Sequence, residues 1–250
     1  MLDKKPKRII SLVPSQTELL FNFGLEEEVV GLTKFCVHPK GWLSQKKIIG
    51  GTKNPNIQLI QSLNPDLVIA NKEENRKEDI EIISQFCPVW VSDVHNLNTA
   101  CDMILSLGEI VGKSDIANQL INDIRNSFGT LNLFSSHIRC AYLIWWNPIM
   151  LAGPNTFINY MLTTIGMTNV CDSNESRYPE LSLGQIKEFD PEVILLSSEP
   201  FPFSEKHIRE LRKEFSNTKI ILVDGELFSW YGPRLLLFKE YAQKLKIQLF

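Results

Sequence analysis

The sequence RIISLVPSQTELLFNFG at residues 8–24 predicts a β-strand followed directly by an α-helix. Residues 8–13 form a run rich in β-branched side chains, which favours a strand. Ser15 and Glu18 then have the spacing of a capping box, in which two side chains bond the free backbone N–H groups of the first helical turn. Gly24 is a residue at which helices commonly stop, so the predicted helix ends just before it.

Strands and helices keep alternating through the first half of the chain. Strands are predicted at residues 29–33, 67–70 and 88–92, and helices at residues 57–63 and 76–86. This order indicates a mostly parallel sheet with helices on its faces, because parallel neighbours need a crossover connection.

A long helical stretch without strand signals follows. Leu97–Val111 is predicted as one helix, and after a break Ser114 caps a second helix that runs to residue 133. The second helix has apolar residues at helical spacing, and its predicted buried stripe consists of Ile116, Leu120, Ile121, Ile124 and Phe128.

Alternation then resumes, with strands at 139–145, 193–197 and 219–223 and helices at 155–165, 182–189, 204–215 and 233–245. We therefore predict two α/β lobes joined by a helix. The predicted N-terminal lobe covers residues 1–113, the bridging helix residues 114–134, and the C-terminal lobe residues 135–250.

A similarity between two segments of the sequence, here called the internal echo, favours this division into two lobes. The segment IQLIQSLNPDLVI at residues 57–69 resembles LGQIKEFDPEVIL at residues 183–195. Each reads as a helix, an Asn-Pro or Asp-Pro turn, an acidic residue and a buried strand. Proline turns before strands are common, so coincidence is the alternative; we favour a correspondence between the lobes.

Composition and charge restrict the possible classes of function. The 250 residues are 44% hydrophobic and 22% charged, which is ordinary for a globular protein. A formal charge of -3 provides no overall positive field, so we expect no nucleic-acid partner. The longest apolar stretch, residues 140–146, is far shorter than the roughly 20 residues of a membrane-spanning helix.

Cysteines and the N-terminus bear on the cellular compartment. The five cysteines include no C-x-x-C pair, which suits reduced, buried thiols. The opening MLDKKPKRIISLVP has no apolar core or cleavage site of a secretory leader, so we expect a cytoplasmic location. Removal of a leader would instead make the protein periplasmic or exported.

In their order along the chain, the segments resemble class III solute-binding proteins, the vitamin B12 and siderophore class with the helical-backbone metal-receptor fold. The resemblance rests on RIISLVPSQTELLFNFG with VVGLT after it, IGGTKNPNIQLIQSLNPDLVIAN and LNTACDMILSLGEIVGKSDIANQLI, and later on LAGPNTFINYMLTTIGMTNV and YPELSLGQIKEFDPEVILL. It implies two Rossmann-like lobes with mostly parallel sheets, joined by one long backbone helix, with a ligand cleft between the lobes.

The resemblance also implies a function. It indicates a substrate-binding protein of ABC-transporter type that binds a corrinoid, a ferric siderophore or another metal chelate. We expect a monomer with no required cofactor, although a corrinoid, a ferric chelate or a divalent metal could be bound. An ABC permease is the implied partner, to which exported members present a glutamate on each lobe. Glu78 could serve on the first lobe, but residues 229–234 contain no acid and Glu226 lies a few residues early, which argues against docking of this kind.

Candidate ligand-binding residues lie on predicted loops after strands, or before the last helix. No G-x-G-x-x-G, Walker, H-E-x-x-H or G-x-S-x-G motif occurs, so we expect a binding protein rather than an enzyme. Aromatic faces suit a flat, partly apolar ligand, and charged groups suit its polar substituents. Only one of Trp145 and Trp146 can face the ligand, because neighbouring side chains of a strand point oppositely. The predicted ligand-binding residues are Trp42, Glu74, Asn75, Arg76, Trp146, Arg177, Tyr178, Glu199, Trp230 and Tyr231. For the residues at 74–76 the alternative is a solvated helix start, and for the aromatic residues it is core packing.

Cys36 and His38 are the candidate metal ligands. They lie two residues apart after a predicted strand, so both can face one side of an extended segment. The alternative is a buried thiol beside a surface imidazole. A second hypothesis for the whole protein follows: a cytoplasmic metal-handling protein or enzyme on the same fold that uses Cys36 and His38. A soluble ligand sensor is a third hypothesis.

Overall fold

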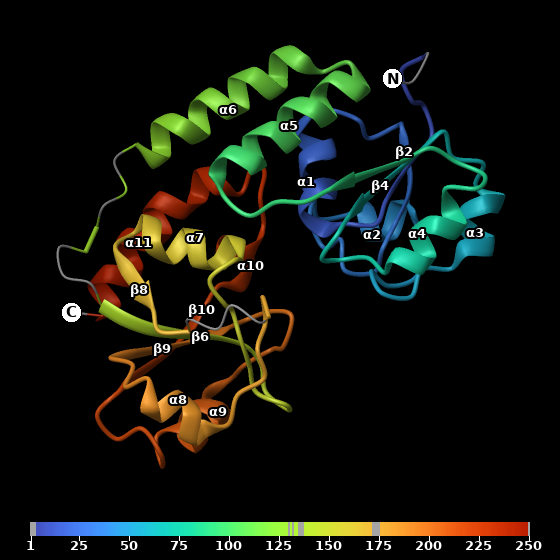
Figure 1. Ribbon diagram of the computed structural model, residues 1–250. Helices are drawn as coiled ribbons and strands as arrows, with labels where there is room; N and C mark the ends of the chain where they lie inside the picture. Colours follow the sequence, from blue (N-terminus) through green and yellow to red (C-terminus); the bar gives the residue numbers. More distant parts are fainter. Residues whose placement is uncertain (1–3, 130, 132, 135–137, 172–175, 250) are drawn as a thin grey trace. The chain divides into compact units, whose positions relative to one another are not determined.

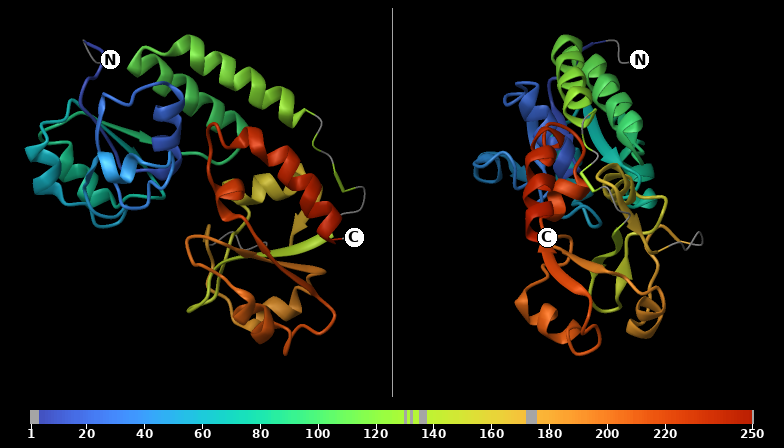
Figure 2. Two further views of the ribbon diagram at one scale, coloured as in Figure 1. Left: turned by 180° about the vertical axis from the view of Figure 1, so that it is seen from behind. Right: turned by 90° about the vertical axis from the view of Figure 1, so that its left-hand side faces the viewer.

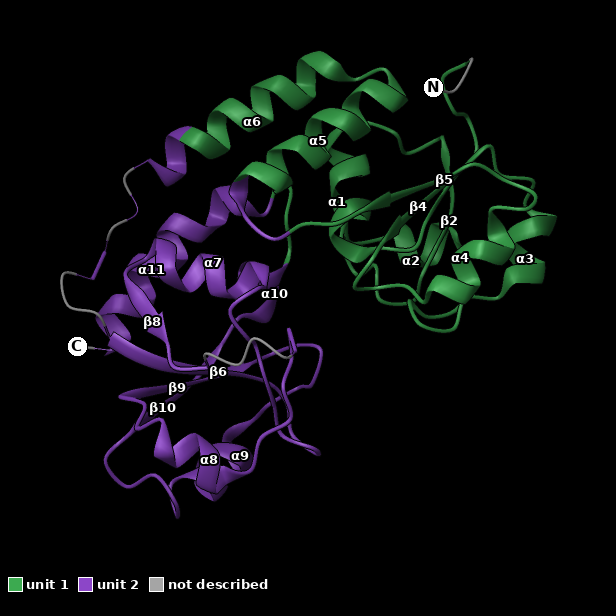
Figure 3. Cartoon of the chain, in the orientation of Figure 1, with its two compact units in different colours: residues 1–94, 98–125, 230–233 green, residues 95–97, 126–229, 234–250 purple. Residues whose placement is uncertain are grey.

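The computed structural model describes residues 4–129, 131, 133–134, 138–171 and 176–249 (Figure 1). The chain divides into two compact units (Figure 3). Unit 1 comprises residues 1–94, 98–125 and 230–233, and unit 2 comprises residues 95–97, 126–229 and 234–250. Among the described residues, none of the helices is long and apolar enough to span a bilayer.

Unit 1 is built on a parallel sheet. Its strands are β1 (Ile9–Ser11), β2 (Val29–Leu32), β3 (Lys47–Ile48), β4 (Leu67–Asn71) and β5 (Val89–Ser92), in the spatial order β3-β2-β1-β4-β5. The connecting helices are α1 (Pro14–Asn22), α2 (Trp42–Gln45), α3 (Ile57–Ser62) and α4 (Lys77–Ile83). Apolar residues of α3 and α4 pack on one face of the sheet, around Ile10, Val68 and Ala70 (Figures 1 and 2).

Two long helices follow β5. These are α5 (Leu97–Val111), with the predicted bounds, and α6 (Ser114–Phe128), within which the chain passes from unit 1 to unit 2 (Figure 3).

Unit 2 contains a mostly parallel sheet. Its strands are β6 (Ile138–Trp145), β7 (Met150–Leu151), β8 (Met167–Asn169), β9 (Val193–Ser197) and β10 (Lys219–Val223). The order is β10-β9-β6-β7, with β8 paired to the start of β6; of the pairings between these strands, that of β6 with β7 is antiparallel and the others are parallel.

Helices cover both faces of this second sheet. They are α7 (Phe157–Thr164), α8 (Leu183–Glu188), α9 (Glu205–Leu211), α10 (Gly225–Ser229) and α11 (Leu235–Leu249). α8 and α9 pack on one face, and α7, α10 and α11 lie on the other (Figures 1 and 2). The predicted α/β class with two mostly parallel sheets is confirmed.

Several local predictions are wrong. The capping box of Ser15 and Glu18 is not formed, because α1 begins one residue earlier at Pro14, a residue suited to the first helical position, after Val13. The helix expected to reach residue 133 ends at Phe128, and Ile116 of its predicted buried stripe is 41% exposed. The short elements α2, β3, β7, β8 and α10 were not predicted.

One short excursion links the two units near the C-terminus. Trp230–Pro233 belong to unit 1, although α10 before them and α11 after them belong to unit 2. The Trp230 ring is 6% exposed and lies edge-on to His38 at a centroid distance of 5.6 Å. At the base of the excursion, Arg234 pairs with Glu226 at 2.9 Å, and the exposed fractions of their side chains are 10% and 21%.

The internal echo is present in the structure as a repeated turn. In unit 1, Asn64 has φ 51°, and Asp66 accepts hydrogen bonds from the backbone N–H groups of Lys7 and Arg8, at 2.7 and 2.9 Å. The Arg8 side chain donates to the Leu63 carbonyl at the end of α3. The turn therefore ties the start of β1 to the start of β4.

Unit 2 repeats this arrangement with different residues. Asp190 has φ 47°, Glu192 accepts a hydrogen bond of 2.8 Å from the backbone N–H of Arg139, and the Arg139 side chain donates to the Asp190 carbonyl. This turn ties β6 to β9. The correspondence between the two halves of the chain is thus confirmed by matched contacts.

We predict that Asp66→Ala and Glu192→Ala each destabilise the protein by about 1 kcal/mol, with the larger loss in Asp66→Ala, because Asp66 accepts two backbone hydrogen bonds at its turn and Glu192 accepts one. Chemical unfolding of both variants measures the two values. A loss confined to one variant would contradict the equivalence of the turns.

Candidate functional site

Buried polar side chains gather where the strands of unit 1 end. Because β1, β2, β4 and β5 are parallel, the loops after them meet at one edge of the sheet, here named the unit 1 edge. The polar residues buried there, each at most 6% exposed, are Ser11, Gln16, Thr17, Thr33, Asn71, Asn75 and Ser92.

Asn75 holds three loops of the unit 1 edge together. Its side-chain oxygen accepts a 2.8 Å hydrogen bond from the backbone N–H of Asn71. Its amide nitrogen donates to the carbonyls of Thr52, at 3.0 Å, and Leu12, at 3.4 Å. The amide is thus engaged in the frame of the edge, with its side chain 6% exposed.

Cys36 lies beneath the same edge and is fully buried. Thr17 donates a hydrogen bond of 3.1 Å to its sulfur, and Thr33 lies 3.3 Å from it. Burial raises the pKa of the Cys36 thiol, which keeps it protonated and weakens it as a metal ligand. All five cysteines are free and buried, as predicted.

The metal hypothesis for Cys36 and His38 stays a prediction. His38 is half-buried and faces the Trp230 ring. Within the described residues, no group of three or more His, Cys, Asp and Glu side chains is arranged to hold a metal ion.

Glu74 is the acid of the unit 1 edge with a perturbed ionisation. Burial raises the pKa of its carboxyl, the positive charge of Lys53 opposes the rise, and Glu73 adds to it. The charge of Glu74 also raises the pKa of Cys36, so the two groups lie near each other. The structure therefore brings the predicted residues Glu74, Asn75 and Cys36 together at one edge.

Replacing Glu74 by glutamine is expected to make stability less dependent on pH. Because the pKa is raised in the folded state, the contribution of this group is fully present below its ordinary pKa of 4.5 and is lost as the pH rises through the folded pKa. Glu74→Gln should raise Tm at about pH 7.5 and change it little at about pH 4. Thermal melts across this range, with exposed Glu78→Gln as the control, provide the measurement. An equal change in Tm at both pH values would contradict the assignment.

Other predicted residues of unit 1 lie apart from this polar group. Arg76 is exposed and pairs with Asp79 at 3.2 Å. Trp42 is 3% exposed and lies edge-on to Phe21 at 5.6 Å, and Trp230 and Tyr231 are also buried. Their rings are part of the packing of unit 1, and their role in ligand binding stays a prediction.

In unit 2, Glu199 is held at the corresponding edge. It lies two residues after β9, and its carboxylate accepts a 2.7 Å hydrogen bond from Ser229 at the end of α10. Gly225 at the start of α10 lies against it, since a Cβ atom on Gly225 would be 2.7 Å from Glu199 Cγ. We name the loops after β6, β9 and β10 the unit 2 edge.

An aromatic cluster lies beside Glu199 at the unit 2 edge. Trp145, 38% exposed, contacts Phe201 at a centroid distance of 5.6 Å. Trp146 is half-buried and packs edge-on against Phe203 and His207, at 6.1 and 5.2 Å. Trp146 therefore faces the core under α9, and Trp145 is the more exposed of the two tryptophans.

His207 is the polar member of this cluster. It is 8% exposed, and its Nδ1 accepts a 3.1 Å hydrogen bond from the Ser204 backbone N–H, completing a capping box at the start of α9.

Arg177 and Tyr178 lie on a segment that runs beside β7. The Gly153 N–H donates to the Arg177 carbonyl at 2.8 Å, and the Leu151 N–H donates to the Pro179 carbonyl at 3.1 Å. The Arg177 guanidinium lies 2.8 Å from Nδ1 of His95, and Tyr178 is half-buried.

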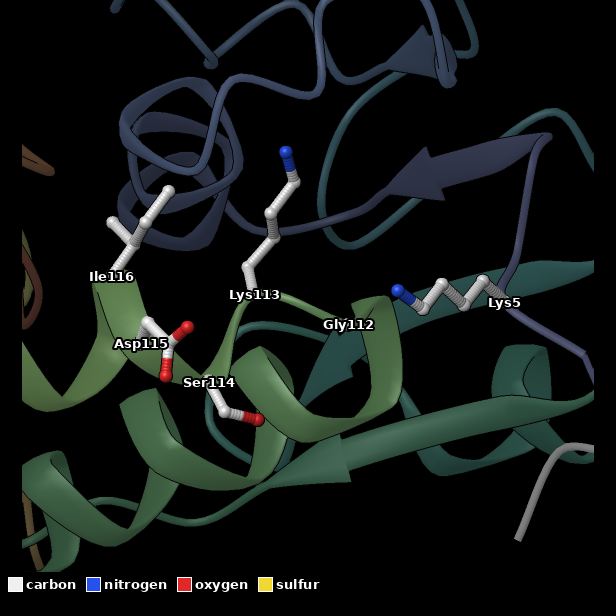
Figure 4. A pocket seen from close by; sticks show the side chains of 6 residues that line it. All are labelled: Lys5, Gly112, Lys113, Ser114, Asp115 and Ile116. Carbon is white, nitrogen blue, oxygen red and sulfur yellow. The ribbon is translucent and has the colours of Figure 1, made fainter.

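A separate pocket lies in unit 1 at the turn between α5 and α6, lined by Lys5, Gly112, Lys113, Ser114, Asp115 and Ile116 (Figure 4). The Lys5 side chain crosses Gly112, which has φ +70°, and a Cβ atom there would lie 2.2 Å from Lys5 Cε. None of these lining residues is a predicted ligand-binding residue.

Sequence reasoning missed Phe201, His207, Gly225 and Ser229. The sequence does carry a weak signal for His207, because Ser204 and His207 have capping-box spacing. Gly225 and Ser229 lie 26 and 30 positions after Glu199 in the chain, and no local pattern connects them.

Comparison with known proteins gives consistent matches over nearly the whole chain. A family model described as "Periplasmic binding protein" matches residues 9–220. An ABC transporter substrate-binding lipoprotein of Bacillus subtilis is 26% identical, over 94% of this chain and 78% of its own length. The vitamin B12-binding protein of Pectobacterium carotovorum is 23% identical, over 98% of this chain and 88% of its own.

Solved structures share the fold. A periplasmic haem-binding protein in complex with two haems has a TM-score of 0.85 at 18% identity, covering 99% of this chain and 100% of that one. The periplasmic vitamin B12 binding protein of Vibrio cholerae has a TM-score of 0.78 at 22% identity, covering 97% of each chain.

These matches overturn one expectation. The cytoplasmic location inferred from the N-terminal sequence is wrong, because the similar proteins are described as periplasmic or as a substrate-binding lipoprotein. The first residues of this sequence were not sufficient to predict the location, because they carry no information about residues outside the given sequence.

Proposed function

The chain belongs to the periplasmic binding protein family, and on this premise we propose that it is the substrate-binding protein of an ABC transporter and acts outside the cytoplasm. Its ligand is a metal chelate, namely a corrinoid, a haem or a ferric siderophore. The vitamin B12-binding and haem-binding relatives support this class of ligand. The protein binds and does not catalyse, and the chelate is its cargo rather than a resident cofactor.

The arrangement at the unit 2 edge carries this proposal. An exposed tryptophan and a phenylalanine form an aromatic surface there, beside an oriented carboxylate. Such a surface buries a flat, partly apolar ring system, and a fixed polar group orients it. In unit 1, Asn75 holds in place the loop that carries Glu74, so this edge is ordered before any ligand binds.

An ABC permease is the proposed partner. Glu78 lies exposed on α4 and is available for docking in unit 1. In unit 2, Glu226 is paired with Arg234, so it is engaged within the fold.

The experiment is a titration with cyanocobalamin, haem and ferric siderophores, followed by tryptophan fluorescence and native mass spectrometry. We expect one chelate to bind as a stoichiometric complex and to quench the fluorescence. Failure of all of them to bind, with no chelate co-purifying, would overturn the proposal.

A matched pair of variants locates the site. Trp145→Ala should weaken binding, because it removes an exposed ring at the unit 2 edge. Leu236→Ala removes an equally exposed apolar side chain on α11 and should leave binding unchanged.

A further inference from the structure

The Glu199 carboxylate has a fixed orientation, unlike a carboxylate that is exposed to solvent and free to rotate. One carboxylate oxygen accepts a hydrogen bond from the Ser229 hydroxyl, and that hydroxyl lies 2.9 Å from the Gly225 carbonyl, so Ser229 links Glu199 to α10. The close approach of Gly225 leaves no space for a side chain between α10 and Glu199. The carboxylate is therefore held in one place while it stays only half-buried.

The surroundings of Glu199 carry further negative charge. Burial raises the pKa of Tyr142 well above its ordinary value, and the carboxylates of Glu199 and Asp224 add to that rise. Asp224 lies at the end of β10, directly before α10. Two acids thus act on the same buried phenol beneath the unit 2 edge.

The aromatic surface beside Glu199 also favours cations and hydrogen-bond donors over anions. Phe201, two residues after Glu199, contacts the exposed Trp145 ring at 5.6 Å. An aromatic face carries negative electrostatic potential, so it attracts cations and N–H donors, as a carboxylate does. Both features disfavour a carboxylate or catecholate group of a ligand placed there.

We infer that Glu199 is a specificity-determining residue that selects a neutral or cationic chelate rich in hydrogen-bond donors and rejects polyanionic chelates. This inference rests on the proposed function, because it chooses among the ligands that the site would bind. Ser229 is a positioning residue that acts through Glu199.

The test compares four probes of different charge on the intact protein. Cyanocobalamin is neutral and rich in amides, and ferrioxamine B is cationic. Haem carries two propionates, and ferric enterobactin is trianionic. We expect cyanocobalamin or ferrioxamine B to bind at least about tenfold more tightly than haem or ferric enterobactin at low salt, and added salt to narrow the difference.

Variants separate charge from folding. Glu199→Gln keeps an acceptor for Ser229 and should reduce the preference for the uncharged or cationic probe by about tenfold, mainly through tighter binding of the anionic probe. Glu205→Gln removes the same charge from an exposed position on α9 and should leave the preference unchanged. Ser229→Ala keeps the charge and frees its orientation, so it should reduce the preference less than Glu199→Gln. Melting of each variant verifies that it is folded.

The outcomes are distinct. Tightest binding of an anionic chelate, or an unchanged preference in folded Glu199→Gln, would overturn the role of Glu199 and leave the proposed function standing. Failure of the native protein to bind any of the four probes would overturn both.

Discussion

Phe228→Ala is expected to lower the free energy of unfolding by about 3–5 kcal/mol, as large aromatic-to-alanine changes in cores do. Phe228 is fully buried on α10. Its ring contacts Tyr142 of β6 at 5.2 Å, Phe238 of α11 at 5.4 Å and Tyr241 of α11 at 6.2 Å. Removing it leaves a cavity where a strand and two helices meet, which the surroundings cannot fill without moving rigid rings.

Urea unfolding followed by circular dichroism measures this loss. Phe228→Leu retains most of the apolar volume and should cost clearly less, which separates the cavity from a general effect of substitution. A cost of Phe228→Ala below about 1 kcal/mol would show that α10 is not anchored by this ring.

Asn75→Ala is expected to have the second largest effect, a loss of about 2–3 kcal/mol, because it leaves buried backbone groups without their hydrogen bonds. These groups are the N–H of Asn71 at the end of β4 and the carbonyls of Thr52 and Leu12, which lie on two other segments of the edge. The loops of the unit 1 edge should also become less ordered, so the affinity for the chelate should fall although Asn75 is buried.

Lys77→Ala is the matched control for this prediction. Lys77 lies two residues further on, and its ion pair with Glu81 at 3.6 Å is solvated, with side-chain exposed fractions of 84% and 63%, so its loss should change stability by less than about 0.5 kcal/mol. Calorimetry of both variants, with chelate titration of each, tests the contrast. Equal losses of stability and of chelate affinity in the two variants would contradict the role of Asn75 in holding the edge together.

The sequence allows the long buried elements to be predicted and leaves the short ones undetermined. β9 and β10 have the predicted bounds because each is a continuous apolar run, flanked by turn residues. β3 and β7 have two residues each, too few to show a period, and they exist because a neighbouring strand offers hydrogen bonds. Such pairing is decided by the tertiary fold rather than by local sequence.

The candidate site could likewise be predicted only in part. Glu199 was predicted because it follows a strand, and in a parallel sheet the residues that follow the strands lie at one edge. Alternation along a strand predicts that the Trp145 and Trp146 side chains point in opposite directions, but it does not predict which of them faces α9. Which one is exposed therefore could not be predicted. The orientation of Glu199 depends on Gly225 and Ser229, which only the folded chain brings beside it.

The excursion at Trp230–Pro233 has a consequence for biosynthesis. The sheet of unit 1 is complete once β5 ends at Ser92, yet the buried Trp230 of the same unit follows strands β6 to β10 of unit 2 along the chain. A ribosome-bound chain therefore carries an unfinished unit 1 until those strands of unit 2 have been synthesised. A fragment that stops before Trp230 lacks part of the interior of unit 1.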